Sequence, residues 1–266
     1  MDKQTRKAFI IKQKKQLNLI GVMVERNIKN TYRGSMLGVL WTVLNPLLTM
    51  SVLAFVYSKV FGTNMIEMKY PVYVLSGLIM YSSFFRGGTI MGLPSIVNNR
   101  GLVEQTQIPI TAYPRVATYT SLVNFLFSFV ALVIVMLIYK QPFKWTLLLI
   151  FVDMAPLLLL TMGTTYIVST IYVFFRDIKN IYAVLTQLLM YLTPIFYTMD
   201  RLNNDIVVKL LKFNPMYYFV DYFRLIIIGQ VPSISYHLVI FGMGIAFYAL
   251  GTLIITQNKR KIILGL

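Results

Sequence analysis

The sequence predicts an all-α integral membrane protein with six transmembrane helices, and two properties of its composition support this class. Of its 266 residues, 57% are apolar and only 13% are charged, whereas a soluble domain carries roughly 25% charged residues. The apolar residues also form long unbroken stretches, without the amphipathic periodicity that a soluble helical bundle would show. We expect no cleaved signal peptide, because the basic N-terminal stretch is too long and no small-residue cleavage pattern follows it.

The number of spans follows from their length, since a helix needs roughly 20 residues to cross the hydrocarbon core. We predict a cytoplasmic N-terminal segment (1–35), a cytoplasmic tail (257–266) and spans at 36–60, 72–92, 116–139, 146–174, 181–199 and 236–256. Of the 25 lysines and arginines, sixteen fall in the segments on the side of the termini and seven on the opposite side. The positive-inside rule therefore places both termini in the cytoplasm. Topology thus explains the net charge of +16 better than nucleic-acid binding does.

The segment before the first span predicts an amphipathic helix on the inner leaflet. Leu17, Ile20, Val24 and Ile28 recur at helical spacing, and charged residues occupy the other faces. An ordinary basic flank that only enforces orientation is compatible with the same pattern.

A charged entry and a helix breaker mark the first span. Tyr32 and Arg33 lie where their side chains can reach lipid headgroups, and Gly34 allows the chain to turn into the membrane. Asn45 and Pro46 then remove a backbone hydrogen bond, which bends the span or opens it locally. A plain proline kink that packing accommodates explains the same pair of residues equally well.

A second non-spanning segment lies between spans five and six, at residues 206–229. It is apolar, but Asn214 and Pro215 divide it into halves too short to cross the membrane. We therefore predict a re-entrant pair of short helices in which Asp221 and Arg224, three residues apart, pair with each other. The alternative, a seventh span, would place the basic tail outside.

The chain shows no catalytic or metal-binding constellation. It has no cysteine, its carboxylates are scattered, and its single histidine, His237, is expected to be structural. No phosphate-binding G-x-x-x-x-G-K-[ST] loop is present, so we expect no nucleotide cofactor in this chain. Asp153 is the one carboxylate inside an apolar stretch, near the expected outer end of span four, where we expect partial hydration rather than a proton relay.

Four ordered motifs spread over nearly the whole chain carry a family resemblance. They are YRGSMLGVLWTVLNPLLTM before and within span one, FRDIKNI after span four, LTPIFY at 192–197 and NPMYYFVDYFR at 214–224. Together they resemble the permease subunits of type-2 exporter-class ABC transporters, and most closely the branch that exports O-antigen, teichoic acid and related cell-surface glycans.

The resemblance implies a bacterial cytoplasmic-membrane homodimer that works with two copies of a separate nucleotide-binding subunit. That subunit would bind ATP and Mg, and the cargo would be a glycan linked to undecaprenyl diphosphate. Contact with the ATPase is assigned to the loop at 95–109, where polar side chains are available; the segment after span four serves either this contact or local anchoring. The coupling residues are Arg100, Glu104, Gln105, Arg176 and Asp177.

A glycan path should offer aromatic faces for sugar rings and weakly bonding polar groups. In span two, four aromatic residues fall within about 120° of one another at 100° per residue, although packing or a lipid-facing belt explains the same face. The path candidates are Tyr32, Arg33, Trp41, Asn45, Tyr73, Tyr81, Phe84, Phe85, Tyr191 and Tyr197. The outer-gate candidates are Asn214, Pro215, Tyr217, Tyr218, Asp221, Tyr222 and Arg224.

Three other functions compete with glycan export. An exporter of a drug or a small lipid would share the fold, and the sequence does not separate the two. A membrane-embedded glycosyltransferase would need acidic or histidine residues gathered at one membrane face, which the sequence does not show. The long cytoplasmic coupling segment disfavours a stand-alone channel.

Overall fold

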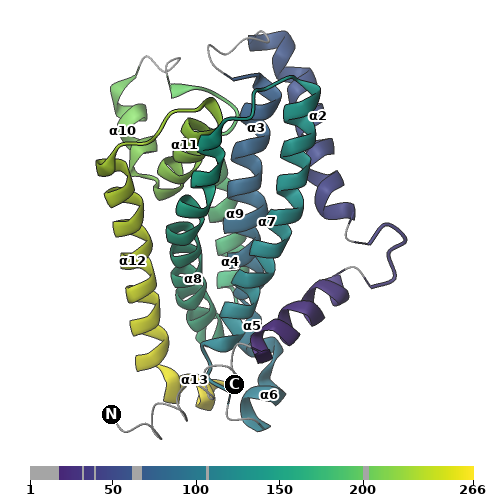
Figure 1. Ribbon diagram of the computed structural model, residues 1–266. Helices are drawn as coiled ribbons and strands as arrows, with labels where there is room; N and C mark the ends of the chain where they lie inside the picture. Colours follow the sequence, from purple (N-terminus) through teal and green to yellow (C-terminus); the bar gives the residue numbers. More distant parts are fainter. Residues whose placement is uncertain (1–17, 32, 39, 62–67, 106–107, 200–203) are drawn as a thin grey trace, which may run out of the picture.

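The computed structural model describes residues 18–31, 33–38, 40–61, 68–105, 108–199 and 204–266, which fold as a helical bundle (Figure 1). Within these ranges the regular elements are all helices. Three of them are long and apolar enough to cross a membrane: α7 (Ala112–Ile138), the continuous η2 and α8 (Trp145–Phe174), and α12 (Ile234–Gln257). The predicted all-α fold is therefore confirmed, and the length and composition of these three helices agree with a membrane protein.

The other helices complete the bundle and cover its two ends. The remaining rods are α2 (Leu40–Phe61), the consecutive α3 (Tyr70–Leu78), η1 (Ile79–Arg86) and α4 (Gly87–Gly92), and α9 (Ile178–Tyr191). At one end, called here the α6–α13 end, lie α5 (Ser95–Asn98), α6 (Arg100–Gln105) and α13 (Lys259–Gly265) (Figure 1). At the opposite, α10–α11 end lie α10 (Asp205–Phe213) and α11 (Pro215–Ile228) (Figure 1).

The segment before α2 has the predicted helix and turn. A helix covers residues 18–31, with Ile20 buried on one face and an exposed Lys29–Glu25 ion pair of 2.6 Å on another. The chain then turns at Gly34, whose φ of +81° is in the left-handed region that glycine adopts without strain. The predicted turn at Gly34 is therefore present, and its role in directing the chain into the membrane remains a prediction. Leu17 and Tyr32 lie outside the described residues.

The rod formed by α3, η1 and α4, called here the second rod, contains an unexpected π-helix. Over the eight residues of η1 the hydrogen bonds reach one residue further than in an α-helix, as in the bond from the Gly87 N–H to the Ser82 carbonyl. Because a π-helix turns less per residue, the side-chain directions differ from those of the α-helix assumed from the sequence. π-Helices are rare and appear mostly as single turns within α-helices, frequently at functional sites.

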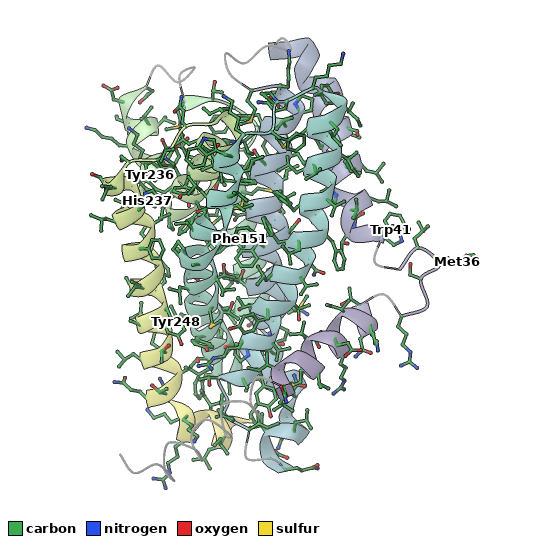
Figure 2. The ribbon with its side chains drawn as sticks, in the orientation of Figure 1. Met36, Trp41, Phe151, Tyr236, His237 and Tyr248 are labelled. Carbon is green, nitrogen blue, oxygen red and sulfur yellow. The ribbon has the colours of Figure 1, made fainter. Side chains whose placement is uncertain are left out.

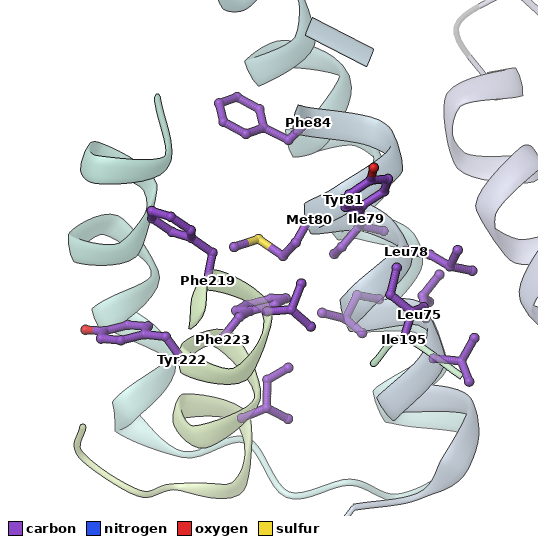
Figure 3. Packing of buried hydrophobic residues seen from close by; sticks show 14 of the residues in the cluster. Leu75, Leu78, Ile79, Met80, Tyr81, Phe84, Ile195, Phe219, Tyr222 and Phe223 are labelled. Atoms are coloured by element: carbon purple, nitrogen blue, oxygen red, sulfur yellow. The ribbon is translucent and has the colours of Figure 1, made fainter. Parts of the chain in front are cut away.

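The core follows from the apolar faces of these rods. A large cluster fills the half of the bundle near α10 and α11, where aromatic residues of η1 and α11 meet aliphatic side chains (Figure 3). Phe84 packs edge-on against Phe125 of α7, with ring centroids 5.9 Å apart. A smaller cluster around Tyr113 and Tyr166 fills the half near the α6–α13 end.

Glycines bring α8 and α12 into backbone contact. A Cβ built at Gly251 would lie 2.8 Å from Cα of Gly163 and closer still to its carbonyl oxygen. A Cβ at Gly244 would lie 3.0 Å from Cα of Pro156. Small residues at these positions allow the two backbones to approach closely, as is common in membrane helix pairs. The pair is therefore a tightly packed part of the bundle.

The helix in predicted span five is shorter than expected. The prediction extended it from 181 to 199, but α9 ends at Tyr191, and residues 192–199 are irregular. Pro194 explains the difference, because proline has no N–H to donate and disfavours the helical conformation of the residue before it. The LTPIFY motif is therefore a loop that follows a helix.

Candidate functional site

A cavity of about 720 Å³ lies between α2, η1, α9 and the loop that follows α9. It is lined by Asn45, Pro46, Thr49, Leu78, Ser82, Ser83, Met190, Tyr191, Phe196 and Tyr197. Asn45, Thr49 and Tyr191 are exposed, so the cavity opens on the surface of the single chain. The Asn45-Pro46 pair noted in the sequence thus lies in the wall of a cavity.

The lining combines small polar groups with aromatic rings. Asn45, Thr49, Ser82 and Ser83 offer an amide and hydroxyls, and two tyrosines and a phenylalanine offer ring faces. The rings of Tyr191 and Phe196 lie 6.4 Å apart between centroids. Such a surface exchanges hydrogen bonds with a hydroxyl-rich ligand and packs against the apolar faces of sugar rings. It has no arrangement for covalent chemistry.

The wall formed by residues 192–197 is fixed to the second rod by tyrosine hydroxyls. Tyr73 donates to the carbonyls of Pro194 (3.1 Å) and Tyr197 (2.7 Å), and Tyr70 donates to the carbonyl of Phe196 (3.2 Å). These bonds satisfy carbonyls that an irregular loop would otherwise leave unpaired. Tyr73, predicted as a path residue, therefore holds the wall that carries Phe196 and Tyr197.

A buried arginine fastens the same loop to α11. Arg224 donates from Nη1 to the Pro194 carbonyl (2.7 Å) and from Nη2 to the carbonyls of Tyr73 (3.1 Å) and Ile195 (3.3 Å). Its guanidinium also lies over the Tyr73 ring, 3.4 Å from the centroid. A cation in the core is tolerated here because three carbonyls and a ring surround it. The LTPIFY and NPMYYFVDYFR motifs are thus one structural unit.

The predicted Asp221–Arg224 pair is wrong. The Asp221 carboxylate accepts a hydrogen bond of 2.7 Å from the Tyr236 hydroxyl of α12, while Arg224 bonds to carbonyls. Residues three apart share a helix face, but here α12 provides a donor for one of them and the loop provides acceptors for the other. Hydrogen-bond partners on α12 and on the loop after α9 are therefore preferred over the local ion pair that the spacing predicted.

Asn214 and Pro215 form the break between α10 and α11, as predicted. The Asn214 side-chain oxygen accepts from the Met216 N–H (3.0 Å), and its amide group donates to the Leu192 carbonyl (3.2 Å) and the Thr193 hydroxyl (2.8 Å). The asparagine therefore caps α11 and holds it against the loop at the same time. Pro215 occupies the first helical position, where its missing N–H costs nothing.

An aromatic cluster occupies the α10–α11 end next to α12. The ring centroids of Tyr217 and Tyr218 lie 5.1 Å apart, those of Tyr218 and Tyr236 lie 6.0 Å apart, and the Tyr222 hydroxyl meets His237 Nε2 at 3.0 Å. Tyr236 and His237 lie together at this end of α12 (Figure 2). The cluster gives His237 a structural partner, and the gate role of the tyrosines remains a prediction.

The remaining path candidates divide into three groups. Tyr81, Phe84 and Phe85 are buried in the core and do not line the cavity, so their burial favours the packing interpretation. Arg33 is exposed, as is Trp41, which lies at the edge of the bundle near Met36 (Figure 2). The third group, Asn45, Tyr191 and Tyr197, lines the cavity.

The coupling candidates are exposed at the α6–α13 end of the bundle. Arg100 and Glu104 form an ion pair of 2.7 Å along α6, with Gln105 beside them, so the two charges are paired with each other in the single chain. Arg176 lies over the Tyr172 ring, 5.0 Å from its centroid, and Asp177 precedes α9. The Arg176 contact supports local anchoring.

Asp153 does not have the expected environment. Its side chain is fully buried near the start of α8, and neither carboxylate oxygen has a hydrogen-bond partner within the described residues. Asp153 is therefore not exposed to bulk water in the single chain, contrary to the exposure expected near the end of a span, because neighbouring residues cover it. No hydrogen-bonded chain among the described residues reaches Asp153, so the structure gives no support to a proton relay.

Several cavity residues were missed by the sequence analysis. Ser82 and Ser83 lie in η1, where the π-helical turn changes which side chains share a face. The Ser83 hydroxyl accepts from Ser128 of α7 at 3.0 Å. Thr49, Leu78 and Met190 are ordinary residues of apolar spans, and the sequence has no signal that separates them from their neighbours. Phe196 lies in the LTPIFY motif, but nothing in that motif indicates that its ring lines a cavity.

Comparison with known proteins agrees with this arrangement. The family model described as ABC-2 type transporter matches residues 18–228, which include the cavity, the loop and α11. The chain belongs to the ABC-2 type transporter family. This chain is therefore a transmembrane permease, and its apolar helices are membrane helices.

Two relatives are similar to this chain over most of its length. The O-antigen export system permease protein RfbA of Myxococcus xanthus is 32% identical over 197 residues, which are 73% of this chain and 74% of the relative. The protein of the same name from Klebsiella pneumoniae is 25% identical over 248 residues, 92% of this chain and 93% of the relative. The permease family resemblance seen in the four motifs is therefore confirmed.

Proposed function

We propose that this chain is the membrane subunit of an ATP-driven exporter that moves a lipid-linked cell-surface glycan across the bacterial cytoplasmic membrane. The cavity between α2, η1 and α9 carries this proposal, because its hydroxyls and aromatic rings suit a hydrated sugar polymer. The names of the two relatives, both O-antigen export permeases, support the same class of cargo.

We further propose six membrane crossings with both termini in the cytoplasm. The crossings are α2, the rod of α3, η1 and α4, then α7, α8, α9 with the loop after it, and α12. The α6–α13 end would face the cytoplasm, in agreement with the charge distribution of the sequence. Because α10 and α11 lie together at the opposite end, they suit the predicted re-entrant pair of half-helices (Figure 1).

A second copy of the chain would complete the path. Next to the cavity, α9 exposes large apolar side chains that the described part of the chain leaves uncovered, among them Leu185 at 53% and Leu188 at 54% exposure. A contiguous exposed apolar surface beside a polar cavity suits a homodimer with the cavity at or near the dimer interface. Lipid would cover the part of this surface that the partner leaves free.

Energy would come from two copies of a separate ABC subunit that binds ATP and Mg, since this chain has no phosphate-binding loop. The exposed helices α5 and α6 lie at the proposed cytoplasmic end and are the nearest candidates for its docking. Charge reversal of Arg100 and Glu104 together preserves their mutual ion pair, whereas either reversal alone breaks it. The single reversals should therefore weaken capture of the ATPase more than the double reversal does, if the pair is what the partner recognises.

Reconstitution tests the proposal. The chain and its ATPase partner in liposomes should move an undecaprenyl-diphosphate-linked glycan to the opposite leaflet only with ATP, and the chain alone should hydrolyse no ATP. Transport of small drugs or phospholipids without glycan transport would support the same-fold alternative and contradict glycan export. Glycan bond formation by the purified chain would instead indicate a glycosyltransferase.

A further inference from the structure

An arginine lies inside the second rod, one turn from residues that line the cavity. Arg86 is the last residue of η1 and is followed by the six residues of α4. At 1.5 Å per residue this places it roughly 9 Å from the cytoplasmic end of the rod. A charge within a membrane span costs about 2.5–3.5 kcal/mol at the helix centre, and such residues usually mark a functional position.

Two helices place Arg86 next to the cavity. Its Nε donates to the Thr186 hydroxyl of α9 at 3.4 Å. Ser82 precedes Arg86 by four residues, Met190 follows Thr186 by four residues, and both line the cavity, with Ser82 Oγ 3.8 Å from Met190 Sδ. Because α9 is an α-helix, Thr186 and Met190 lie on about the same face of it. The Arg86–Thr186 pair therefore lies one turn below the cavity, toward the cytoplasmic end.

The charge of Arg86 is not balanced by a carboxylate among the residues that the structure describes. The ion pairs in those residues are Lys29–Glu25 and Arg100–Glu104, both on exposed helices. Arg86 is half-buried, and its contact with Thr186 uses only Nε. Its two terminal NH₂ groups make no hydrogen bond within the described residues. Guanidinium groups present this planar fork to phosphate in a two-bond geometry.

We propose that Arg86 binds the phosphate of a lipid headgroup at the cytoplasmic end of the cavity. This rests on the proposed function, in which the cavity receives a lipid-linked glycan. A lipid is favoured over a soluble phosphate because Arg86 lies within a membrane span, and because exposed leucines of the adjacent α9 offer an apolar surface for the lipid chain. The sugar part would then occupy the polar and aromatic cavity one turn above.

Binding measurements on the full chain in nanodiscs test the proposal. The probes are undecaprenyl diphosphate, uncharged undecaprenol and inorganic diphosphate, and the variants are Arg86→Gln and Arg86→Lys. Arg86→Gln should bind undecaprenyl diphosphate about tenfold more weakly or worse, as expected for loss of charge-assisted hydrogen bonds, with undecaprenol unchanged. Arg86→Lys keeps the charge and should retain part of the affinity.

The matched control is Arg115→Gln. Arg115 is also half-buried near the end of a membrane helix, but it donates to the Tyr166 hydroxyl of α8, a helix that contributes no residue to the cavity wall, whereas Arg86 bonds to α9, which does. Its loss should leave both lipid affinities unchanged. Melting temperatures of the variants, measured in the same nanodiscs, would show whether either substitution unfolds the chain.

Three results would overturn the inference. Equal affinity of the wild type and Arg86→Gln for undecaprenyl diphosphate would exclude Arg86 as its ligand, even if export continues. A wild type that does not distinguish undecaprenyl diphosphate from undecaprenol would exclude a headgroup site. Displacement of the lipid by equimolar inorganic diphosphate would assign the site to a soluble anion. Failure of the proposed function is separate, because it would appear as absence of glycan transport by the complete transporter.

Discussion

Replacement of Gly251 by alanine should destabilise the protein through a clash in the α8–α12 contact. The new Cβ would start 2.8 Å from Cα of Gly163, whereas carbon atoms prefer about 3.5–4.0 Å, so the helices must separate by roughly 1 Å. A gap of this size forfeits about a quarter to a half of each dispersion contact along the interface. Overpacking of this kind typically costs about 1–3 kcal/mol.

The same helix offers a matched control. A Cβ at Gly242 would have nothing within 4 Å. Gly242→Ala should therefore change the free energy of unfolding only through the higher helix propensity of alanine, by about 1 kcal/mol in favour of the folded state. Gly251→Ala has the same propensity gain, and the difference between the two variants therefore isolates the clash. We expect Gly251→Ala to be less stable than Gly242→Ala by about 1–3 kcal/mol.

Denaturant titration in mixed micelles, followed by circular dichroism, measures this difference. Gly242→Ala should unfold at the same or a higher denaturant concentration than the wild type, and Gly251→Ala at a lower one than Gly242→Ala. If both variants unfold together, the two backbones are not in contact at Gly251, and the description of α8 and α12 as a tightly packed pair is wrong.

Three further predictions concern the loop and the entry to α2. Arg224→Lys keeps the charge but loses the fork that reaches three carbonyls, so it should lower stability by about 2–4 kcal/mol and reduce export; wild-type behaviour would show that the fork is not needed. Asn214→Ala should cost about 1–2 kcal/mol more than Asn204→Ala, because both asparagines cap helices but only Asn214 also bonds to the loop after α9; equal losses would contradict that second role. Gly34→Ala should destabilise the protein by about 1 kcal/mol, because alanine is strained at a φ of +81°. Gly21→Ala should stabilise the protein, because Gly21 lies within a helix and its new Cβ would touch no neighbour. A higher melting temperature for Gly34→Ala than for Gly21→Ala would refute the turn.

The sequence predicted the features that depend on local rules. Apolar length predicted the helices, the Asn214-Pro215 pair predicted the break between α10 and α11, and Gly34 predicted a turn before α2. Each of these depends on residues that are neighbours in the sequence. The permease family was also accessible, because four motifs preserve their order along the chain.

The features that the sequence missed depend on long-range contacts or on a change of helix type. The acceptors of Arg224 are backbone carbonyls more than 25 residues away, and a carbonyl has no sequence signature. The aromatic face of span two was derived at 100° per residue, which does not hold across the π-helix η1. The sequence does show Arg86 as a charged residue in an apolar stretch. That it lies beside a cavity follows only from the way η1 and α9 pack together in the structure.

The most direct test of the account is whether the cavity between α2, η1 and α9 carries the cargo. The chain has no cysteine, so Thr49→Cys in the cavity wall and Leu253→Cys on the exposed surface of α12 can each be labelled with a bulky maleimide. In liposomes that contain the ATPase partner, labelled Thr49→Cys should stop export of the lipid-linked glycan, while unlabelled Thr49→Cys and labelled Leu253→Cys export normally. Normal export by fully labelled Thr49→Cys would show that the glycan does not pass through this cavity.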